Sequence, residues 1–405
     1  MTSAVLEKPE TFTPSSEEDC AALFKNAEST LPFAVVGGGT RAVGKVLDVP
    51  HHTLSTAGLS GIVDYEPAEM VMIARAGTPM AQINAALEEG RQRMIFEPMD
   101  LRPLLGTKGQ NTIGGVVATN ASGPRRFVAG AARDSMLGIR FVNGKGDVIK
   151  TGGRVMKNVT GLDLVKLLTG SWGTLGVMTE VTFKVVPVVE TERTLILHGL
   201  SDADAAAMMA KAMATSCEVS GAAHLPANIA GRLGATAGQA ATLLRLEGFA
   251  SSVDLRAKKL KDLLDHTGEI SEQDASASRQ MWRDIRDVEP FADATQTPVW
   301  RVSVAPMAGH RLVQELTTRL GEIDAFYDWQ GGLVWLRLNA GAEADAVRSA
   351  VAKVGGGHAT LMRASEAVRA ETAIFQTEDP AVKTLSEAVR MKFDPFSRLN
   401  PGRMH

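Results

Sequence analysis

Three consecutive glycines followed by a hydroxyl and a guanidinium form the most suggestive cluster in the sequence, Gly37-Gly38-Gly39-Thr40-Arg41. The cluster follows the apolar run Phe33–Val36, which predicts a strand that ends in a tight loop. Glycines place no Cβ in the way, so several backbone N–H groups can point into one concavity, and Thr40 and Arg41 add a donor and a cation. This chemistry suits a pyrophosphate. A plain glycine-rich turn is an equal alternative on the loop alone.

The same residues also fit a dinucleotide-binding fingerprint. Gly37, Gly39 and Ala42 match G-x-G-x-x-A, and Asp64 lies at a suitable distance for a ribose acid. That fingerprint must open a long helix. Because Gly44 intervenes and the strand pattern resumes at Lys45, the sequence predicts no such helix. We therefore expect loop amides to hold the phosphates without a helix behind them.

Further motifs follow the loop in a set order. They read Glu97-Pro98-Met99-Asp100, Gly109-Gln110-Asn111-Thr112-Ile113-Gly114-Gly115, Thr119-Asn120-Ala121-Ser122-Gly123, Arg133-Asp134-Ser135-Met136-Leu137-Gly138, Gly161-Leu162-Asp163-Leu164 and Gly170-Ser171-Trp172-Gly173-Thr174-Leu175-Gly176-Val177. Together they resemble the FAD-binding domain of the vanillyl-alcohol-oxidase family, also called the PCMH type. The ending Phe393-Asp394-Pro395 with Leu399-Asn400-Pro401-Gly402 resembles the lactate/glycolate dehydrogenase branch of that family.

This resemblance implies a set of FAD-binding residues. Besides the loop from Gly37 to Arg41, the flavin and its ribityl chain would be lined by Thr112, Gly114, Gly115, Thr119, Asn120 and Gly123. Asp134 and Val177 would lie along the FAD, and Asn400 would close over the ring. Pro98 and Gly176, which belong to the same motifs, would also bind the cofactor. The alternatives are turn formation for the glycines and a surface ion pair for Asp134. Because the first loop contains no His that could tether the flavin, we expect noncovalent FAD.

The second half of the chain lacks the catalytic motifs of that branch. Full-length members usually carry a His pair and an E-H-G segment that bind metal and substrate, whereas the histidines beyond residue 190 all stand alone. We therefore predict no metal site, and the catalytic residues are unknown at this point. Arg301 and Arg337 lie on predicted strands and could clamp a substrate carboxylate near the flavin, with Trp335 on the face of Arg337. A solvated sheet face is the simpler interpretation of these residues.

The whole pattern resembles the smaller FAD-binding subunits of bacterial glycolate oxidases. The resemblance implies a complex with a larger flavin-binding paralogue subunit and an iron–sulfur subunit, which oxidises glycolate to glyoxylate and passes electrons to quinone. Two alternatives stay open. The chain could be an independent flavin-dependent dehydrogenase of a small 2-hydroxy acid such as D-lactate, or a non-catalytic scaffold subunit with bound FAD.

The predicted elements indicate an α+β architecture. We expect an N-terminal arm over residues 1–30, a two-part FAD-binding domain over 31–190, an α+β cap domain over 191–375, and a C-terminal segment over 376–405 that returns to the FAD site. The cap pattern predicts an antiparallel sheet with helices on one face. Residues 98–134 show little periodicity and predict a long functional loop.

Composition narrows the function classes further. The chain has 405 residues, 44% hydrophobic and 22% charged, which is ordinary for globular proteins. Its 43 basic and 46 acidic residues give a net charge of -3, which argues against nucleic acid as a partner. Cys20 and Cys217 are too few for an iron–sulfur cluster. Without a signal peptide or a long apolar run, we expect a cytoplasmic protein with no direct membrane span. It could lie peripherally on the inner face of the plasma membrane through its complex.

Overall fold

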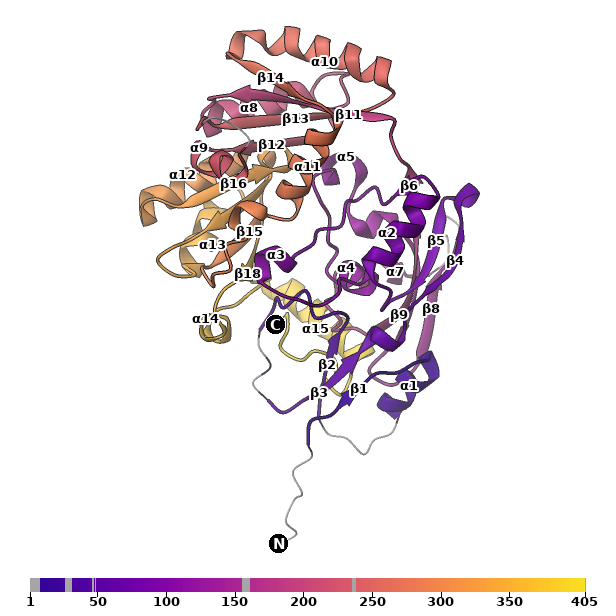
Figure 1. The fold of residues 1–405 in the computed structure, drawn as a ribbon. Helices are drawn as coiled ribbons and strands as arrows, with labels where there is room; N and C mark the ends of the chain where they lie inside the picture. Colours follow the sequence, from indigo (N-terminus) through magenta and orange to yellow (C-terminus); the bar gives the residue numbers. More distant parts are fainter. Residues whose placement is uncertain are drawn as a thin grey trace.

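The computed structural model describes residues 8–25, 31–45, 47, 49–154, 161–234 and 238–404. Figure 1 shows two parts: a first part that holds the glycine loop, and a second part, here called the cap, that follows it in the chain. The helices and strands are mixed in both parts, so the predicted α+β class is confirmed.

A small parallel sheet begins the first part and ends at the glycine loop. Its strands, in the order β1-β3-β2, are β1 (Thr11–Phe12), β3 (His52–Ser55) and β2 (Phe33–Val36). Phe33 is 2% exposed and packs with Phe24 of α1 (Glu17–Lys25), Leu54 and Leu399. Burial of this apolar strand fixes the point at which the glycines leave the sheet.

No helix begins between the glycine loop and β3 in the described residues, as predicted. The strand that we expected to begin at Lys45 is wrong, however, because Lys45, Leu47 and Val49 lie outside any strand. Positions 46 and 48 lie outside the described residues. The next strand is β3, seven residues after Lys45.

A five-stranded antiparallel sheet carries the rest of the first part, in the order β4-β5-β9-β7-β8. These strands are β4 (Ile62–Glu66), β5 (Val71–Arg75), β7 (Met136–Val142), β8 (Val148–Gly152) and β9 (Val177–Lys184). The helix α2 (Met80–Glu89) buries Met80, Ile83 and Leu87 in the same core, and it ends at Gly90. A two-stranded ribbon of β6 (Gln92–Arg93) and β10 (Val186–Pro187) leads into the cap.

The segment 98–134 is not the uninterrupted loop that we expected. It holds three short helices, α3 (Arg102–Leu105), α4 (Ile113–Ala118) and α5 (Arg126–Ala129), and the start of a fourth, α6 (Ala132–Ser135). Helices of four to six residues complete less than two turns, so they leave no readable 3.6-residue period in the sequence. A further short helix, α7 (Leu164–Leu168), packs on β7.

An eight-stranded antiparallel sheet forms the cap, in the order β14-β11-β13-β12-β16-β17-β15-β18. Its strands are β11 (Thr191–His198), β12 (Gly221–Leu225), β13 (Ala241–Gly248), β14 (Ile270–Gln273), β15 (Val299–Ser303), β16 (Asp324–Asp328), β17 (Leu333–Arg337) and β18 (His358–Arg363). The antiparallel sheet is therefore confirmed.

Helices cover both faces of this sheet, which corrects the expectation of one covered face. Leu195 and Leu197 of β11 pack with α10 (Ala250–Leu264), whereas Ile196 lies in the core that holds Trp282 of α11 (Ala275–Arg286). Successive residues of a strand point to opposite faces, so α10 and α11 lie on opposite sides. The remaining cap helices are α8 (Asp202–Met213), α9 (Ala227–Ala230), α12 (Gly309–Leu320) and α13 (Ala344–Lys353).

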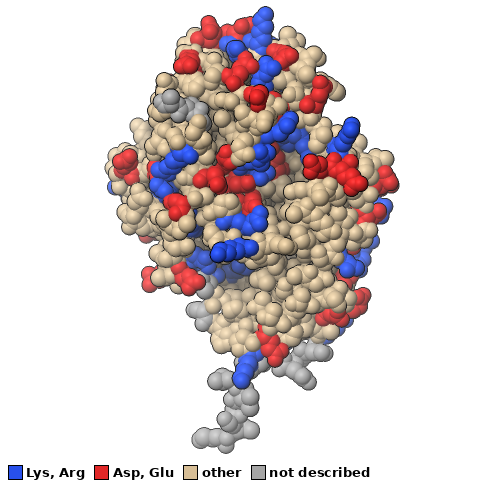
Figure 2. Space-filling view, in the orientation of Figure 1, with Lys and Arg blue, Asp and Glu red and all other residues tan. Residues whose placement is uncertain are grey.

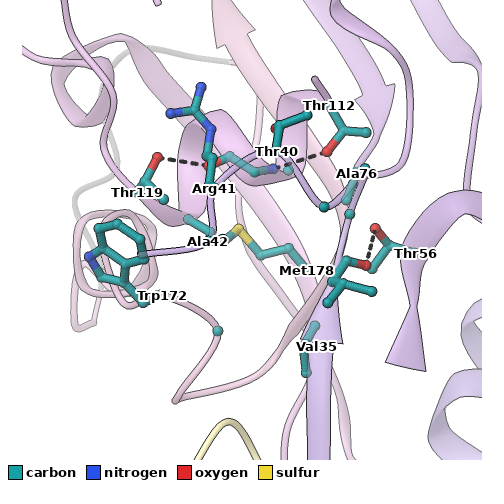
Figure 3. Close-up of a pocket in the computed structure, with 18 of the residues that line it drawn as sticks. Val35, Thr40, Arg41, Ala42, Thr56, Ala76, Thr112, Thr119, Trp172 and Met178 are labelled. Atoms are coloured by element: carbon teal, nitrogen blue, oxygen red, sulfur yellow. Dashed lines mark hydrogen bonds between the residues drawn. The ribbon is translucent and has the colours of Figure 1, made fainter. Parts of the chain in front are cut away.

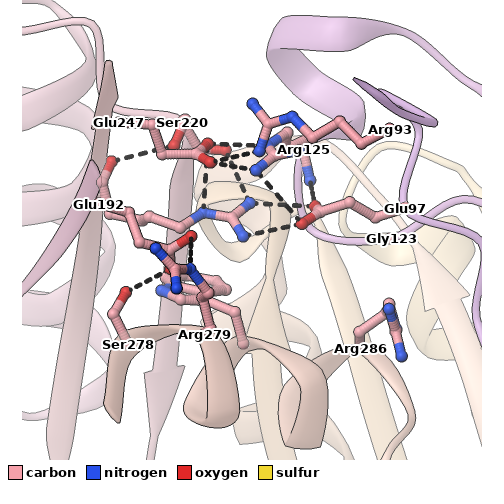
Figure 4. Close-up of polar contacts among 12 residues, drawn as sticks. Arg93, Glu97, Gly123, Arg125, Glu192, Ser220, Glu247, Ser278, Arg279 and Arg286 are labelled. Atoms are coloured by element: carbon pink, nitrogen blue, oxygen red, sulfur yellow. Dashed lines mark hydrogen bonds and ion pairs between the residues drawn. The ribbon is translucent and has the colours of Figure 1, made fainter. Parts of the chain in front are cut away.

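Buried ion pairs join the cap to the first part (Figure 4). Arg245 of β13 donates to both carboxylate oxygens of Glu97 at 2.9 and 3.0 Å. Glu247 of the same strand accepts from Arg125 at 2.7 Å and from Arg93 at 2.9 Å. Arg245 is 1% exposed and its guanidinium lies 4.6 Å from the ring centre of Trp282. The arginines keep the pKa of Glu97 and of Glu247 below the usual value against the effect of burial.

The final described segment returns to the first part, as predicted. After α14 (Glu366–Glu371) and α15 (Pro380–Phe393), Leu399 forms a parallel bridge with Phe33 of β2. Asn400 accepts a hydrogen bond from the Val35 N–H at 2.8 Å and donates to the Trp172 carbonyl at 2.8 Å. In the described part of the chain, we find no helix with the length and apolar character needed to cross a bilayer.

Candidate cofactor site

A cavity of about 300 Å³ lies against the glycine loop and is called here the glycine-loop cavity. Ten of the predicted cofactor residues line it: Gly37, Gly38, Gly39, Thr40, Arg41, Thr112, Gly114, Gly115, Thr119 and Gly176. Figure 3 shows Trp172 on one side of the cavity and Ala76 and Thr56 on the other, with Met178 between them. The structure therefore brings the two glycine segments of the sequence together around one space.

Close backbone packing explains the glycines of the loop. A Cβ on Gly38 would lie 1.5 Å from the Gln110 carbonyl oxygen, and one on Gly37 would lie 2.4 Å from the Thr112 hydroxyl. Gly39 has a φ of +69°, and a Cβ there would meet nothing within 4 Å. The loop is thus pressed against the Gln110–Thr112 segment on one side and leaves bare backbone on the other. Such a surface fits the close approach of a pyrophosphate.

Arg41 leaves two buried donors without a partner. Its Nη2 donates to the Met99 carbonyl at 2.7 Å and to the Asn111 side chain at 3.2 Å. Its Nε and Nη1 are buried and have no hydrogen-bond partner among the described residues. Burial lowers the pKa of Arg41 to about 10, so the group is still a cation at neutral pH. An unsatisfied buried cation beside a glycine loop is a fit for a negatively charged cofactor group.

The second glycine segment forms the opposite wall through α4. Thr112 caps this helix and accepts from the Gly115 N–H at 3.3 Å. A Cβ on Gly114 would lie 2.7 Å from the Ala76 carbonyl oxygen, so only glycine permits this approach to the end of β5. Thr119 donates to the Gly115 carbonyl at 2.8 Å. The wall therefore combines a close backbone contact with two positioned hydroxyls, which suits a flat ring and its polar chain.

Six predicted residues do not line the glycine-loop cavity: Pro98, Asn120, Gly123, Asp134, Val177 and Asn400. Asn400 instead holds two of its walls, β2 and the Trp172 backbone. Val177 is buried in the small core around Phe33. Gly123 accepts at its carbonyl from the Trp329 indole N–H at 3.0 Å. The roles of all six toward FAD stay predictions.

Asp134 forms no ion pair in the described part of the chain, which argues against the surface ion pair considered for it. Its carboxylate accepts from the Ala131 N–H at 2.8 Å. Pro98 lines a separate groove of about 920 Å³ between the first part and the cap. Figure 2 shows Lys and Arg side chains gathered, among acidic ones, over the middle of the face that it draws.

A second cavity of about 630 Å³, called here the arginine cavity, shares Arg41, Thr119 and Trp172 with the first. Its other walls include Asn120, Arg126, Arg301, Ser303, Trp329, His358 and Thr360. The predicted pair of arginines is therefore separated. Arg301 lines this cavity, whereas Arg337 donates to Asp293 at 2.6 Å and also pairs with Asp324. Trp335 is 1% exposed and packs against Phe326, away from both cavities.

Sequence reasoning missed Arg126, Trp329 and His358. Strand alternation places Arg301 beside Ser303 on one face, and the β15–β18 pairing sets Thr360 and His358 opposite them. That register depends on a long-range pairing, which no local pattern reveals. The described residues contain no group of three or more His, Cys, Asp or Glu side chains arranged to hold a metal ion.

Comparisons with known proteins support the cofactor. The model of the FAD binding domain family matches residues 10–152. The glycolate oxidase subunit GlcE of Escherichia coli (strain K12) is 32% identical over 387 residues, which cover 92% of this chain and 93% of that protein. A D-lactate dehydrogenase of Archaeoglobus fulgidus is 32% identical over 43% of this chain and 38% of its own length.

The solved structure of p-cresol methylhydroxylase with substrate bound shares the fold, with a TM-score of 0.70. Its alignment covers 97% of this chain and 88% of that one at 15% sequence identity. FAD is accordingly the cofactor of this chain. The chain belongs to the PCMH-type FAD-binding family of oxidoreductases, in the group that contains the glycolate oxidase subunit GlcE.

Proposed function

We propose that this chain is the FAD-binding subunit of a complex that oxidises glycolate to glyoxylate. In this proposal a larger flavin-binding paralogue and an iron–sulfur subunit complete the complex, which passes electrons to quinone. Similarity to a glycolate oxidase subunit over nearly the full chain supports it. The observation that carries it is the junction of the two cavities at Arg41, Thr119 and Trp172, because a bound flavin there would face the arginine cavity.

Each wall of the glycine-loop cavity has a part in this proposal. Bound FAD supplies the two-electron acceptor of the reaction. The amides of Gly37–Gly39, with Thr40 and Arg41, hold the pyrophosphate, and Gly114 and Gly115 admit the ring. None of the described residues that line this cavity is a His, Cys or Tyr, which supports noncovalent attachment. Asn400 acts indirectly by holding β2 and Trp172 in place.

Anaerobic absorption spectroscopy tests the proposal. The purified chain is mixed with glycolate, first alone and then with the larger flavin subunit, and the visible band of oxidised flavin is followed. Bleaching that requires the partner is the expected result. A purified chain without flavin, or a flavin that glycolate cannot reduce even in the complex, contradicts the proposal.

An independent dehydrogenase of a small 2-hydroxy acid is the second candidate. The related D-lactate dehydrogenase and the cationic lining of the arginine cavity favour it. Bleaching of the isolated chain by glycolate or D-lactate, with no partner present, would select this candidate over the first.

A further inference from the structure

Two guanidinium groups in the arginine cavity, those of Arg126 and Arg301, form no ion pair with any described residue. The guanidinium carbons of Arg126 and Arg301 lie 4.7 and 4.9 Å from the ring centre of Trp329. Both residues are partly buried. Within the described part of the chain, neither side chain has a hydrogen bond or an ion pair. Two like charges are thus held on one indole ring beside an open space.

Three arginines that lie near Arg126 and Arg301, by contrast, are paired with carboxylates. Arg125, one residue before Arg126, is paired with Glu247. Arg337 and Arg363, on the strands that flank β15, are paired with Asp293. Arg126 and Arg301 therefore lack the carboxylate partner that each of these three neighbouring arginines has.

The charged groups around the two arginines do not neutralise them. Glu378 and Asp379 line the same cavity from the segment before α15, but neither forms an ion pair with Arg126 or Arg301. Asp134 acts on Arg126, and Asp328 acts on Arg301, only at longer range and without an ion pair. Burial, together with the charge of Arg126, lowers the pKa of Arg301 to about 10, which leaves it a cation at neutral pH.

We propose that Arg126 and Arg301, held on Trp329, bind the carboxylate of a small 2-hydroxy acid within this chain itself. This inference rests on the proposed function and deepens it, because it places the acid in this subunit as well as in any partner. A carboxylate accepts charge-assisted hydrogen bonds from guanidinium groups. Ser303, Thr360 and His358 supply polar groups for the hydroxyl of the acid on the wall that carries Arg301.

Calorimetric titration of the flavin-loaded protein with glycolate tests the site. Acetate keeps the carboxylate and lacks the hydroxyl, whereas ethylene glycol keeps hydroxyls and lacks the carboxylate. We expect glycolate and acetate to bind and ethylene glycol to give no heat. Binding of ethylene glycol as tight as that of glycolate would overturn the inference, because the arginines would then have no part in it.

Variants assign the binding to the two arginines. Arg301→Gln and Arg126→Gln should each weaken glycolate binding roughly 10- to 100-fold, the usual effect of losing a charged hydrogen bond. Arg301→Lys should recover part of the loss, because it keeps the charge and loses the planar fork. The exposed Arg311→Gln of α12 is the matched control and should bind as the parent does. Unchanged affinity in both glutamine variants overturns the inference.

Flavin absorbance and melting temperature, recorded on every sample, separate the two hypotheses. A sample that retains flavin and does not bind glycolate contradicts the arginine site alone. A sample that binds glycolate and carries no flavin contradicts the proposed function alone. Because Arg126 lies on α5 and Arg301 on β15, misfolding of one variant leaves the other as an independent test.

Discussion

Neighbouring glycines of the loop serve different purposes. Gly38 is required by the Gln110 carbonyl against which it packs, whereas Gly39 is required by its positive φ and by the open space beside it. Glycine is needed at position 38 by the packing of the fold. Glycine is needed at position 39 by the backbone conformation and by the space that the ligand would occupy. This difference makes the two positions separable by experiment.

Gly38→Ala should abolish retention of FAD, because the added Cβ would force the loop away from Gln110. Gly39→Ala should be milder and cost about 1–2 kcal/mol through its left-handed backbone. The flavin-to-protein ratio after gel filtration and the melting temperature measure both effects. Gly231→Ala is the control, because its Cβ would meet nothing within 4 Å and its φ is not positive. Full flavin content in Gly38→Ala would contradict this account of the loop.

Asp328 links stability to pH. Burial raises its pKa to about 7, so the folded protein keeps a proton that the unfolded chain releases between about pH 4 and 7. The folded state then binds more protons in this window, so the unfolding free energy falls as pH rises and levels off above about pH 7.

Asp328→Asn should reduce the change in unfolding free energy between pH 4 and 8 by on the order of 3 kcal/mol. The side-chain oxygen of the asparagine can still accept from the Trp329 N–H. Denaturant unfolding at the two pH values is the measurement. The exposed Asp262→Asn serves as the control. Equal pH dependence in parent and Asp328→Asn would show that the carboxyl is ionised in the folded state.

At the scale of single residues, the sequence predicted the glycine-rich walls well and the cations poorly. Glycines and threonines in order along the chain identify a cofactor wall without knowledge of the fold. Arg126 was not singled out in the sequence, and Arg301 was considered only together with Arg337, which lies elsewhere. The fold instead places Arg126 and Arg301 on one indole ring without ion pairs, and that arrangement depends on contacts between distant segments.

At the scale of elements, the ribbon β6 and the strand β13 carry the ion pairs between the first part and the cap. Glu247 faces Arg93 and Arg125, and the latter begins the turn that leads into α5. The network therefore positions the helix that presents Arg126 to the arginine cavity. A buried pair is costly to break, because the remaining partner keeps an uncompensated charge.

Glu247→Gln should lower the unfolding free energy by about 3–5 kcal/mol. Glu315→Gln, which removes the partner of Lys353 in an exposed pair, should cost less than about 1 kcal/mol. Equilibrium denaturation of both variants measures the difference. Similar losses in the two variants would mean that the buried network contributes no more than a surface pair does.

Element prediction succeeded where a local pattern was readable. The apolar run Phe33–Val36 predicted a strand that ends at the glycine loop, and the structure has this strand. The short helices between residues 98 and 134 were missed because none of them spans two full turns, which leaves no repeated pattern in the sequence. The position of α11 opposite α10 also required the sheet register, which local sequence does not encode.

At the scale of the whole molecule, the last described segment completes the first sheet. Leu399 bridges Phe33, and the Asn400 side chain joins Val35 to Trp172. Asn400 has a φ of +43°, a conformation that asparagine tolerates better than most residues. The Asn400 side chain thus connects the C-terminal segment to β2 and to the cavity wall at Trp172.

Asn400→Ala should destabilise the fold by about 2–3 kcal/mol, because it removes two hydrogen bonds and leaves the Val35 N–H unsatisfied. The rate of FAD release should rise with it. Fluorescence of released flavin in dilute solution follows that rate. Asn84→Ala on the exposed side of α2 is the control, and an equal release rate in both variants would contradict the role of Asn400.

The hydrogen bond between the Val35 N–H and the Asn400 side chain also sets an order of events during biosynthesis. Val35 and Asn400 are separated by 365 positions, so β2 leaves the ribosome long before its hydrogen-bond partner has been translated. The glycine loop therefore emerges well before Asn400, which completes its supporting wall. Stable flavin loading must then wait until residue 400 has been translated, and a nascent chain arrested before residue 400 should remain apoprotein even in excess FAD.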